Sequence, residues 1–229
     1  ELSKSYHDIN DSVDGGLFDI AKRNLIFNNF RGDVVANLLD GTFNSDVINS
    51  VSKSAWVETV DAANEAYRPG QFTTFAAYEY TTSTEELGNL HRNVVFRGTD
   101  KLPAVPFSRL NSINPEGLWR WMDGLREQGI ESLAIPHNSN GSNGAMFAFT
   151  DWAGNTIDRE YAEQRMRNEP IVEITQVKGT SETHPLLSTR DEFAGFEIMP
   201  YRVATNAISA LNGSYVREAL LNGLALEQS

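Results

Sequence analysis

The amino-acid sequence predicts an α/β fold in which a mixed or mostly parallel sheet is flanked by helices. Short apolar runs bounded by turn residues, typical of buried strands, alternate with segments that repeat apolar residues at helical spacing. This alternation favours at least some parallel pairing, because a helix between two strands carries the chain back across the sheet. With 229 residues, of which 40% are hydrophobic, the chain can bury a sizeable core.

Residues 1–68 are expected to form a helical N-terminal segment that packs on the α/β part, residues 69–229. Three helices are expected here, from Leu17 to Phe27, from Asp33 to Leu39 and from Ser45 to about Tyr67. The residues spaced for the buried face of the third helix are Val47, Ile48, Val51, Ala55, Val57, Val60 and Ala63. The turn sequence Arg68-Pro69-Gly70 ends this helix.

The α/β part is expected to alternate strands and helices. Strands are predicted at residues 72–80, 90–96, 133–136 and 171–175, and helices at 114–129, 158–167, 190–196 and 214–226. The helix start at Asn114-Pro115-Glu116 is well marked, because it combines a cap residue, a proline at the first helical position and an acid in the first turn. The last helix is expected to pack through Val216, Leu220 and Leu224.

Composition excludes several classes of function. The net charge of −12 argues against a non-specific nucleic-acid binder and against attachment to an anionic membrane surface, since both need a basic face. No apolar run approaches the roughly 18 residues of a membrane span. The chain has no cysteine, so any metal must be held by His, Asp and Glu, and either a periplasmic or a cytoplasmic location is compatible with this composition.

Three residues at strand ends or in strands form the strongest candidate site. His137 stands where the apolar run Leu133–Pro136 changes to a loop rich in Asn and Gly, and α/β folds place their chemistry at such strand ends. Glu79 and His91 come from the two preceding strands. Nitrogen and oxygen ligands of this kind suit Zn, Mn or Fe. The alternatives are an edge-strand carboxylate for Glu79 and a surface strand residue for His91.

A second set of polar residues could support the ligands or bind substrate. These residues are Asn138, Asn140, Glu173, Lys178, Glu182 and His184. Two of them have an alternative. Glu173 is predicted in mid-strand and could instead face solvent, and His184 precedes a proline and could have no role beyond shaping a turn. No catalytic residue is assigned, since Ser139 lacks the Gly-x-Ser-x-Gly elbow and the chain contains neither a phosphate-binding loop nor an HExxH motif.

Several stretches carry a resemblance to a known family. They include Pro69–Thr73, Tyr78–Thr81, Asn89–Val94, Ile135–Asn140, Glu169-Pro170, Glu173-Ile174, Gln176 with Lys178-Gly179, Ser181-Glu182, Asp191–Ala194 and Val216–Leu220. From about Trp56 to the C-terminus the chain resembles the bacterial domain-of-unknown-function family 3604 of the PHP (polymerase and histidinol phosphatase) superfamily. The N-terminal helical part matches only loosely.

The resemblance implies a partial PHP-like (β/α) barrel, with residues 69–229 as the central part of the domain. Glu79 matches the carboxylate that bridges metals in that superfamily, and His91 and His137 match the two histidines that follow it. The implied activity is metal-assisted hydrolysis of a small phosphorylated substrate. Divalent metal ions (Zn, Mn or Fe) would lower the pKa of a bound water and neutralise phosphoryl charge.

The sequence departs from the superfamily pattern at three places. The opening His-x-His strand, the later Asp-His pair and the closing Asp-x-His strand are all absent. We therefore expect this chain to be a fragment of a metal-dependent phosphoesterase, with an incomplete metal site that holds one ion or none and with no activity of its own. The alternative is a non-catalytic binding or structural module on a degenerate PHP-like barrel. Exposed sheet edges of such a fragment are expected to drive self-association.

Overall fold

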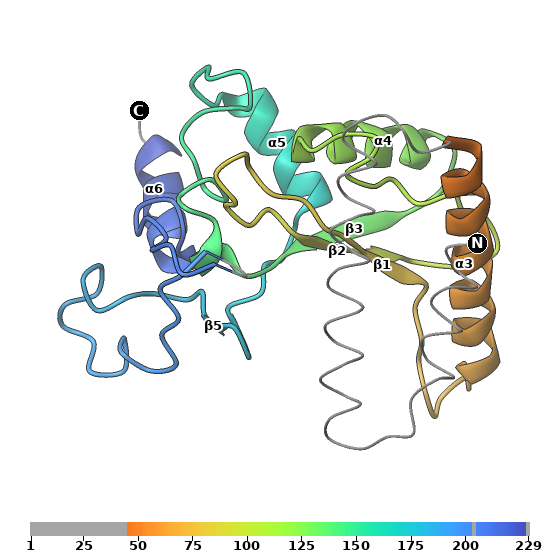
Figure 1. Ribbon diagram of the computed structural model, residues 1–229, viewed down its shortest axis with the longest axis horizontal. Coiled ribbons are helices and arrows are strands. Elements are labelled where there is room, and N and C mark those ends of the chain that lie inside the picture. The colour runs from red at the N-terminus through yellow and green to blue at the C-terminus, as the bar shows by residue number, and fades with distance from the viewer. Residues whose placement is uncertain (1–44, 203–204, 228–229) are drawn as a thin grey trace. The chain divides into compact units, whose positions relative to one another are not determined.

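The computed structural model describes residues 45–202 and 205–227 (Figure 1). The helices predicted from Leu17 and from Asp33 lie outside these residues. The chain divides into two units with the boundary after Glu58, inside helix α3 (Ser45–Ala66). Apart from α3, the elements discussed below belong to the second unit. None of the helices in the described ranges is both long and apolar enough to cross a bilayer.

Helix α3 has the bounds predicted for it but not the predicted buried face. Ser45–Ala66 agrees with a helix that starts at Ser45 and stops before Arg68. Val51 and Val57 are exposed, and Trp56 is the buried hydrophobic residue of the described part of this helix. A stripe of apolar residues is buried only where another element covers it, so the stripe alone did not identify the packed face.

The centre of the second unit is a three-stranded antiparallel sheet. Its strands are β1 (Ala77–Tyr80), β2 (Arg92–Phe96) and β3 (Ser132–Pro136), in the order β1-β2-β3 (Figure 1). Tyr80 pairs with Arg92, and Arg92 pairs with Pro136 on its other side. A second, two-stranded antiparallel sheet joins β4 (Thr175–Gln176) to β5 (Gly179–Thr180). The prediction of a partial, mostly parallel (β/α) barrel was wrong, because every strand pair in the described residues is antiparallel and no barrel closes.

The connection between β2 and β3 explains why the parallel prediction failed. The chain leaves β2 at Phe96 and crosses the sheet in an irregular segment. By Ser112 and Ile113 it has reached the opposite end, where their carbonyls accept hydrogen bonds from Tyr80 Oη and Thr82 Oγ1. Helix α4 (Pro115–Glu127) then brings the chain back to Ser132, the partner of Phe96. The loop carries the chain to the far end of the sheet, and α4 carries it back to the end where β2 stopped. β3 therefore starts beside the end of β2, and the two strands run in opposite directions.

Helices α4 and α5 (Arg159–Asn168) lie beside β3, on one side of the sheet (Figure 1). Both starts were predicted correctly. Asn114 caps α4 by accepting a hydrogen bond from the Glu116 N–H, and Asp158 caps α5 by accepting one from the Tyr161 N–H. The core between helices and sheet is made by Val94, Phe96, Leu118, Trp119, Met122, Leu125 and Ala134.

The prediction of a strand at residues 171–175 was wrong apart from Thr175, which belongs to β4. Glu173 N–H donates to the Pro136 carbonyl at 3.0 Å, so this segment does touch the free edge of β3. Pro136 has no N–H to give in return, which prevents a regular ladder at this point. Ile171 and Ile174 remain about half exposed, so no burial stabilises a longer strand.

Two further C-terminal predictions need correction. Residues 190–196 form turns in place of a helix, and the last helix, α6, covers Val216–Glu227. Val216 is buried as expected, but Leu220 and Leu224 are 66% and 60% exposed. The predicted face of α6 is therefore not packed within the described part of the chain.

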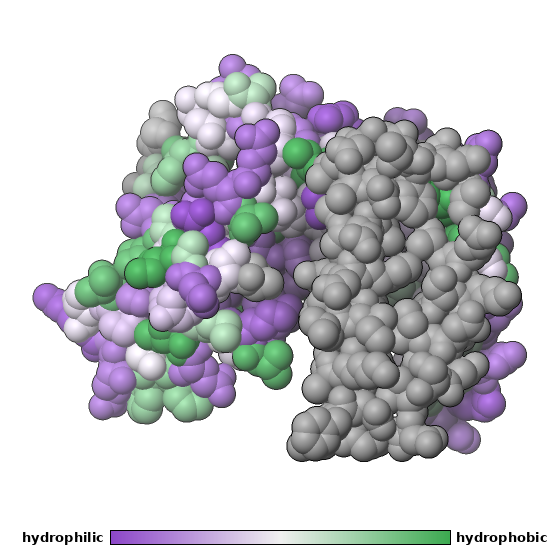
Figure 2. Space-filling model, viewed as in Figure 1, coloured by the Kyte–Doolittle hydropathy of each residue, from purple (hydrophilic) through white to green (hydrophobic). Residues whose placement is uncertain are grey.

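The C-terminal third exposes hydrophobic side chains among polar ones (Figure 2). The largest exposed fractions are 95% for Val177, 75% for Phe193, 72% for Leu186 and 70% for both Phe196 and Ile208. Single exposed apolar residues are ordinary on proteins, but several large ones close in sequence form a surface prone to association.

Candidate metal centre

The strand register places Glu79, His91 and His137 on one face of the sheet. Glu79 pairs with Asn93, and Asn93 pairs with Ile135, so these three side chains share a face. His91 lies two residues before Asn93, and His137 lies two residues after Ile135, which keeps both on that face. The His137 N–H donates to the His91 carbonyl at 3.3 Å, which extends the ladder by one step and sets the two histidines opposite each other.

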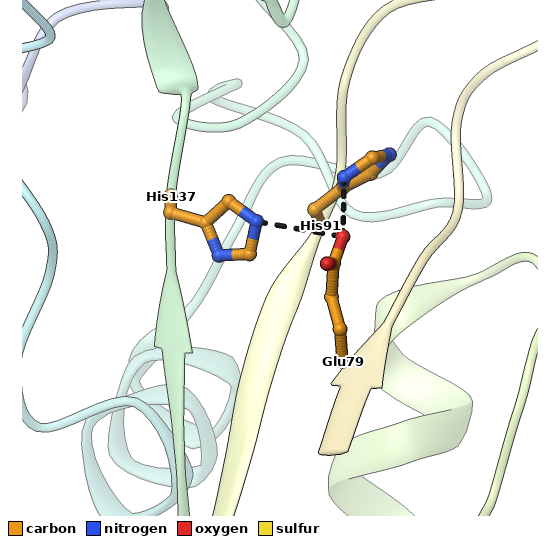
Figure 3. A group of neighbouring side chains, drawn as sticks. All are labelled: Glu79, His91 and His137. Carbon is orange, nitrogen blue, oxygen red and sulfur yellow. Dashed lines mark ion pairs between the residues drawn. The ribbon is translucent and has the colours of Figure 1, made fainter. Parts of the chain in front are cut away.

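The three side chains converge at the ends of their strands (Figure 3). His91 Nδ1 lies 2.7 Å from Glu79 Oε1, and His137 Nε2 lies 3.6 Å from the same oxygen. The imidazole rings are 5.7 Å apart between centroids and nearly perpendicular, at 85°. One ligand atom from each residue lies within 4.8 Å of the others.

Burial and neighbouring polar groups shift the pKa values of His91 and Glu79. Burial is the largest influence on His91 and lowers its pKa to about 4, although the Glu79 carboxylate acts to raise it. His91 is therefore neutral near pH 7, which is the form that coordinates metals. Burial acts to raise the pKa of Glu79, but a hydrogen bond from Thr81 and favourable electrostatic interactions, including that with Lys178, outweigh it, so the pKa is lowered and the carboxylate is ionised.

The donor set fits a divalent cation in chemistry and approximately in spacing. Two imidazoles and a carboxylate are ligands that zinc and other first-row metals accept. In a tetrahedral site with bonds of about 2.1 Å, neighbouring ligand atoms lie about 3.4 Å apart. The His137–Glu79 distance of 3.6 Å is close to this value, and the His91–Glu79 distance of 2.7 Å is shorter. The contact between buried His91 Nδ1 and Glu79 Oε1 is that of an ion pair, which two ligands of one metal ion would have to open slightly.

The loop after β3 holds His137 in place. Asn138 adopts a left-handed conformation with φ 53° and is fully buried. The side chain of Asn89, also buried, donates from Nδ2 to the carbonyls of His137 and Asn138 at 2.8 and 3.2 Å. Asn89 was not predicted as a site residue, although it stands two positions before His91 in one of the stretches that carry the family resemblance.

Buried polar atoms without a partner gather beside the histidines. Among the described residues, His137 Nδ1, Asn138 Nδ2 and Ser139 Oγ are buried and make no hydrogen bond. These atoms are consecutive in sequence and follow the end of β3. Buried polar groups are normally satisfied, so unsatisfied donors and acceptors at a cluster of potential ligands indicate that a ligand, ion or water belongs there.

Lys178 is a cation that contacts this loop from a distant part of the chain. Its Nζ donates to Asn138 Oδ1 at 3.1 Å, and its charge contributes to the lowered pKa values of both Glu79 and His91. Of the six supporting residues predicted from the sequence, Asn138 and Lys178 are therefore the two that the structure brings to the candidate metal centre.

The other four supporting candidates have structural contacts elsewhere. Both amide hydrogens and the amide oxygen of Asn140 are engaged in hydrogen bonds, since Nδ2 donates to the Lys178 and Met199 carbonyls and Oδ1 accepts from Ser181 Oγ. Glu173 accepts a hydrogen bond from Gln176, and Glu182 pairs with Arg217.

His184 shapes a turn, as the structural alternative supposed. Its Nδ1 accepts from the Leu186 N–H at 3.2 Å, and its ring packs on Tyr215 with 5.7 Å between centroids. It does not join the group formed by Glu79, His91 and His137.

Comparison with known families gives a match along the whole chain. The profile of the family described as "Protein of unknown function (DUF3604)" matches residues 1–229. The chain belongs to this family. The predicted domain-of-unknown-function family is thus confirmed, and the match includes the N-terminal segment, where the resemblance was loose. Comparisons with curated proteins and with solved structures gave no match.

Proposed function

We propose that this DUF3604 chain carries part of the metal centre of a metal-dependent hydrolase that acts on phosphoesters. The observation that supports this most directly is the convergence of Glu79, His91 and His137 from three strands onto one face of the sheet. A divalent cation held by these residues would supply Lewis-acid chemistry, lowering the pKa of a water molecule and offsetting negative charge on the substrate.

The residues of the proposed site have two roles. Some are metal ligands, and Lys178 and Asn138 form an anion-binding side next to them. Glu79 contributes the negative charge, and His91 contributes a neutral imidazole because burial lowers its pKa. Lys178 and the buried amide Nδ2 of Asn138 offer hydrogen-bond donors beside the ligands. Donors of this kind suit the oxygens of a phosphoryl group.

The choice of phosphoester as substrate class rests on the resemblance to the PHP superfamily. The stretches that carry the resemblance contain all three candidate ligands, together with Asn138 and Lys178. We propose membership of that superfamily on this basis. The antiparallel sheet does not contribute to this part of the proposal, because it differs from the barrel that the resemblance implied.

Metal uptake by the purified chain tests the proposal. Equilibrium dialysis against Zn²⁺ and, separately, Mn²⁺ is expected to give one tightly bound ion per chain. The variants His91→Ala and His137→Ala should each weaken binding by about 100-fold or more, since each removes a ligand. His184→Ala is the matched control and should bind metal as the unchanged chain does.

A structural role for the same residues predicts a different pattern. If the histidines serve only in packing, His137→Ala would lower the melting temperature without altering metal content. That result, or equal metal binding by His137→Ala and His184→Ala, would contradict the proposed metal centre.

The substrate class is tested separately by inorganic phosphate, which should bind the metal-loaded chain more tightly than the metal-free chain.

A further inference from the structure

A cavity of about 530 Å³ lies on the helical side of the sheet, away from the candidate metal centre. Arg92, the residue after His91, lines it. Successive strand residues point to opposite faces, so His91 faces the metal centre while Arg92 faces α4 and α5. The volume falls within the range of small-molecule sites.

The buried end of this cavity carries more positive than negative charge. Glu169 Oε1 accepts from Arg92 Nε at 2.7 Å and from Trp119 Nε1 at 2.7 Å, and its Oε2 accepts from Arg165 Nε at 3.1 Å. The side chains of Arg92 and Glu169 are 2% exposed, and that of Arg165 is 19% exposed. Two guanidinium groups therefore share one carboxylate where solvent screens poorly, which leaves one positive charge in excess.

Each arginine also keeps a donor group free. Arg92 donates from Nε and Nη1, and Arg165 donates from Nε and Nη2 to the Met146 carbonyl. Within the part of the chain that the structure describes, Arg92 Nη2 and Arg165 Nη1 have no hydrogen-bond partner. Both residues line the cavity. Arg165 is the more accessible of the two, at 19% exposed, and guanidinium groups bind carboxylates well.

The outer rim of the cavity has the opposite charge. Glu85, Glu86, Glu116 and Asp151 line it. Arg120 approaches Glu116 to 3.8 Å and Arg202 approaches Glu86 to 3.9 Å, so two cations offset part of this negative charge. A simple anion would be repelled at this rim, whereas a molecule with an ammonium group would be attracted to it.

Aromatic rings lie between the two ends. Trp119 and Tyr161 pack edge to face at 5.4 Å between centroids, and both line the cavity with the 45% exposed Trp152. Aromatic side chains provide apolar surface for a planar or hydrophobic group.

We propose that this cavity binds a small zwitterion of the amino-acid class with an aromatic side chain. The carboxylate of the ligand meets Arg165, with the charge of buried Arg92 behind it, its ammonium group meets the acidic rim, and its ring contacts Trp152 and Tyr161. This site is independent of the proposed hydrolase function, because it uses none of the candidate metal ligands.

Three probes with one ring system test the proposal by isothermal titration calorimetry. L-Tryptophan carries both charges, indole-3-propionate lacks the ammonium group, and tryptamine lacks the carboxylate. L-Tryptophan is expected to bind at least about tenfold more tightly than either of the others, because each lost charge removes a charge-assisted contact. Equal binding of indole-3-propionate would exclude a role for the rim, equal binding of tryptamine would exclude a role for the arginines, and no binding of any probe would overturn the proposal.

Paired variants locate the binding on the protein. Glu116→Gln removes a charge from the rim with little change in size, although only one of its two accepted hydrogen bonds can persist. It should weaken L-tryptophan binding about tenfold while leaving indole-3-propionate binding unchanged or tighter. Its control is Glu127→Gln, an exposed change on the same helix. Arg165→Gln should weaken L-tryptophan at least about tenfold, whereas Arg159→Gln, exposed on the same helix, should not.

Circular dichroism melting identifies any variant that fails to fold. If Arg165→Gln unfolds, the Glu116→Gln result alone decides the proposal. Unchanged L-tryptophan affinity in a folded Glu116→Gln chain would overturn it.

Discussion

His91 and His137 occupy directly opposed positions at the end of the β2–β3 ladder, with their rings 5.7 Å apart and nearly perpendicular. Opposed residues on antiparallel strands share a face, so one register brings the two imidazoles together. Glu79 joins them from β1 at 2.7 and 3.6 Å. The candidate metal centre thus follows from sheet register and not from nearness in sequence.

Asn89→Ala is expected to disturb this centre without removing a ligand. The variant leaves the carbonyls of His137 and Asn138 without the donor that now holds them, which should cost about 1–3 kcal/mol of stability. Zinc affinity should fall by about tenfold, because groups that orient ligands typically contribute that much. Dialysis and urea unfolding measure the two effects. Asn111→Ala, at an exposed asparagine, is the control, and equal zinc affinity in the two variants would exclude this role for Asn89.

Lys178→Met is expected to separate anion binding from metal binding. Methionine keeps much of the length of the side chain but removes the charge and the hydrogen bond to Asn138. Inorganic phosphate should bind the zinc-loaded variant about tenfold more weakly, while zinc itself should bind at least as tightly, because a repelling cation is gone. Lys101→Met is the control. Unchanged phosphate affinity would show that Lys178 does not take part in anion binding.

Asp123 should make the packing of α4 on α5 sensitive to acid. Burial acts to raise its pKa, but hydrogen bonds from Arg167, Gln164 and Asn168 outweigh it and lower the pKa to about 2. A lowered pKa stabilises the folded state above the unfolded value of about 3.9, and this stabilisation is lost as the pH falls from about 4 toward 2.

Asp123→Asn should therefore lower the free energy of unfolding at pH 7 by about 1 kcal/mol, given partial solvent screening. At pH 2.5 the difference from the unchanged chain should be clearly smaller. Urea unfolding at the two pH values measures this. A difference that stays constant from pH 7 to pH 2.5 would show that the charge of Asp123 is not responsible.

Glu169→Gln should be among the most destabilising single changes in the described chain. It leaves Arg92 buried beside Arg165 without a negative charge, and breaking a buried ion pair costs about 3–5 kcal/mol. Glu163→Gln, on the exposed side of α5, should cost less than about 1 kcal/mol. Urea unfolding of both variants checks the prediction, and similar losses in the two would contradict it.

The exposed apolar surface of the C-terminal third should promote self-association. Phe193 and Phe196 are 75% and 70% exposed, and burying such side chains against a second copy is favourable. Light scattering is expected to show mass rising with protein concentration, and the double change Phe193→Asp and Phe196→Asp should reduce it. A monodisperse monomer at all concentrations would be the contrary result.

Local features of the fold could be read from the sequence because neighbouring residues create them. Asn114 and Asp158 start their helices by accepting hydrogen bonds from N–H groups two and three residues further on. The extent of α3 was also predictable, since Arg68-Pro69-Gly70 ends it. For the same reason the sequence alone pointed to Glu79, His91 and His137, whose chemical types and strand-end positions do not depend on how the strands pair.

Only the tertiary structure decided how these parts come together. Strand direction depended on the path of residues 97–114, which crosses the sheet before α4 returns, and no local pattern encodes that path. The shared face of the three candidate ligands depended on register, because a shift of one residue would turn a strand's side chains to the other side. The pairing of Arg92 with Glu169 joins residues 77 positions apart. Such contacts arise from the packing of distant segments, which is why the sequence named the candidate ligands but gave no sign of the charged cavity behind them.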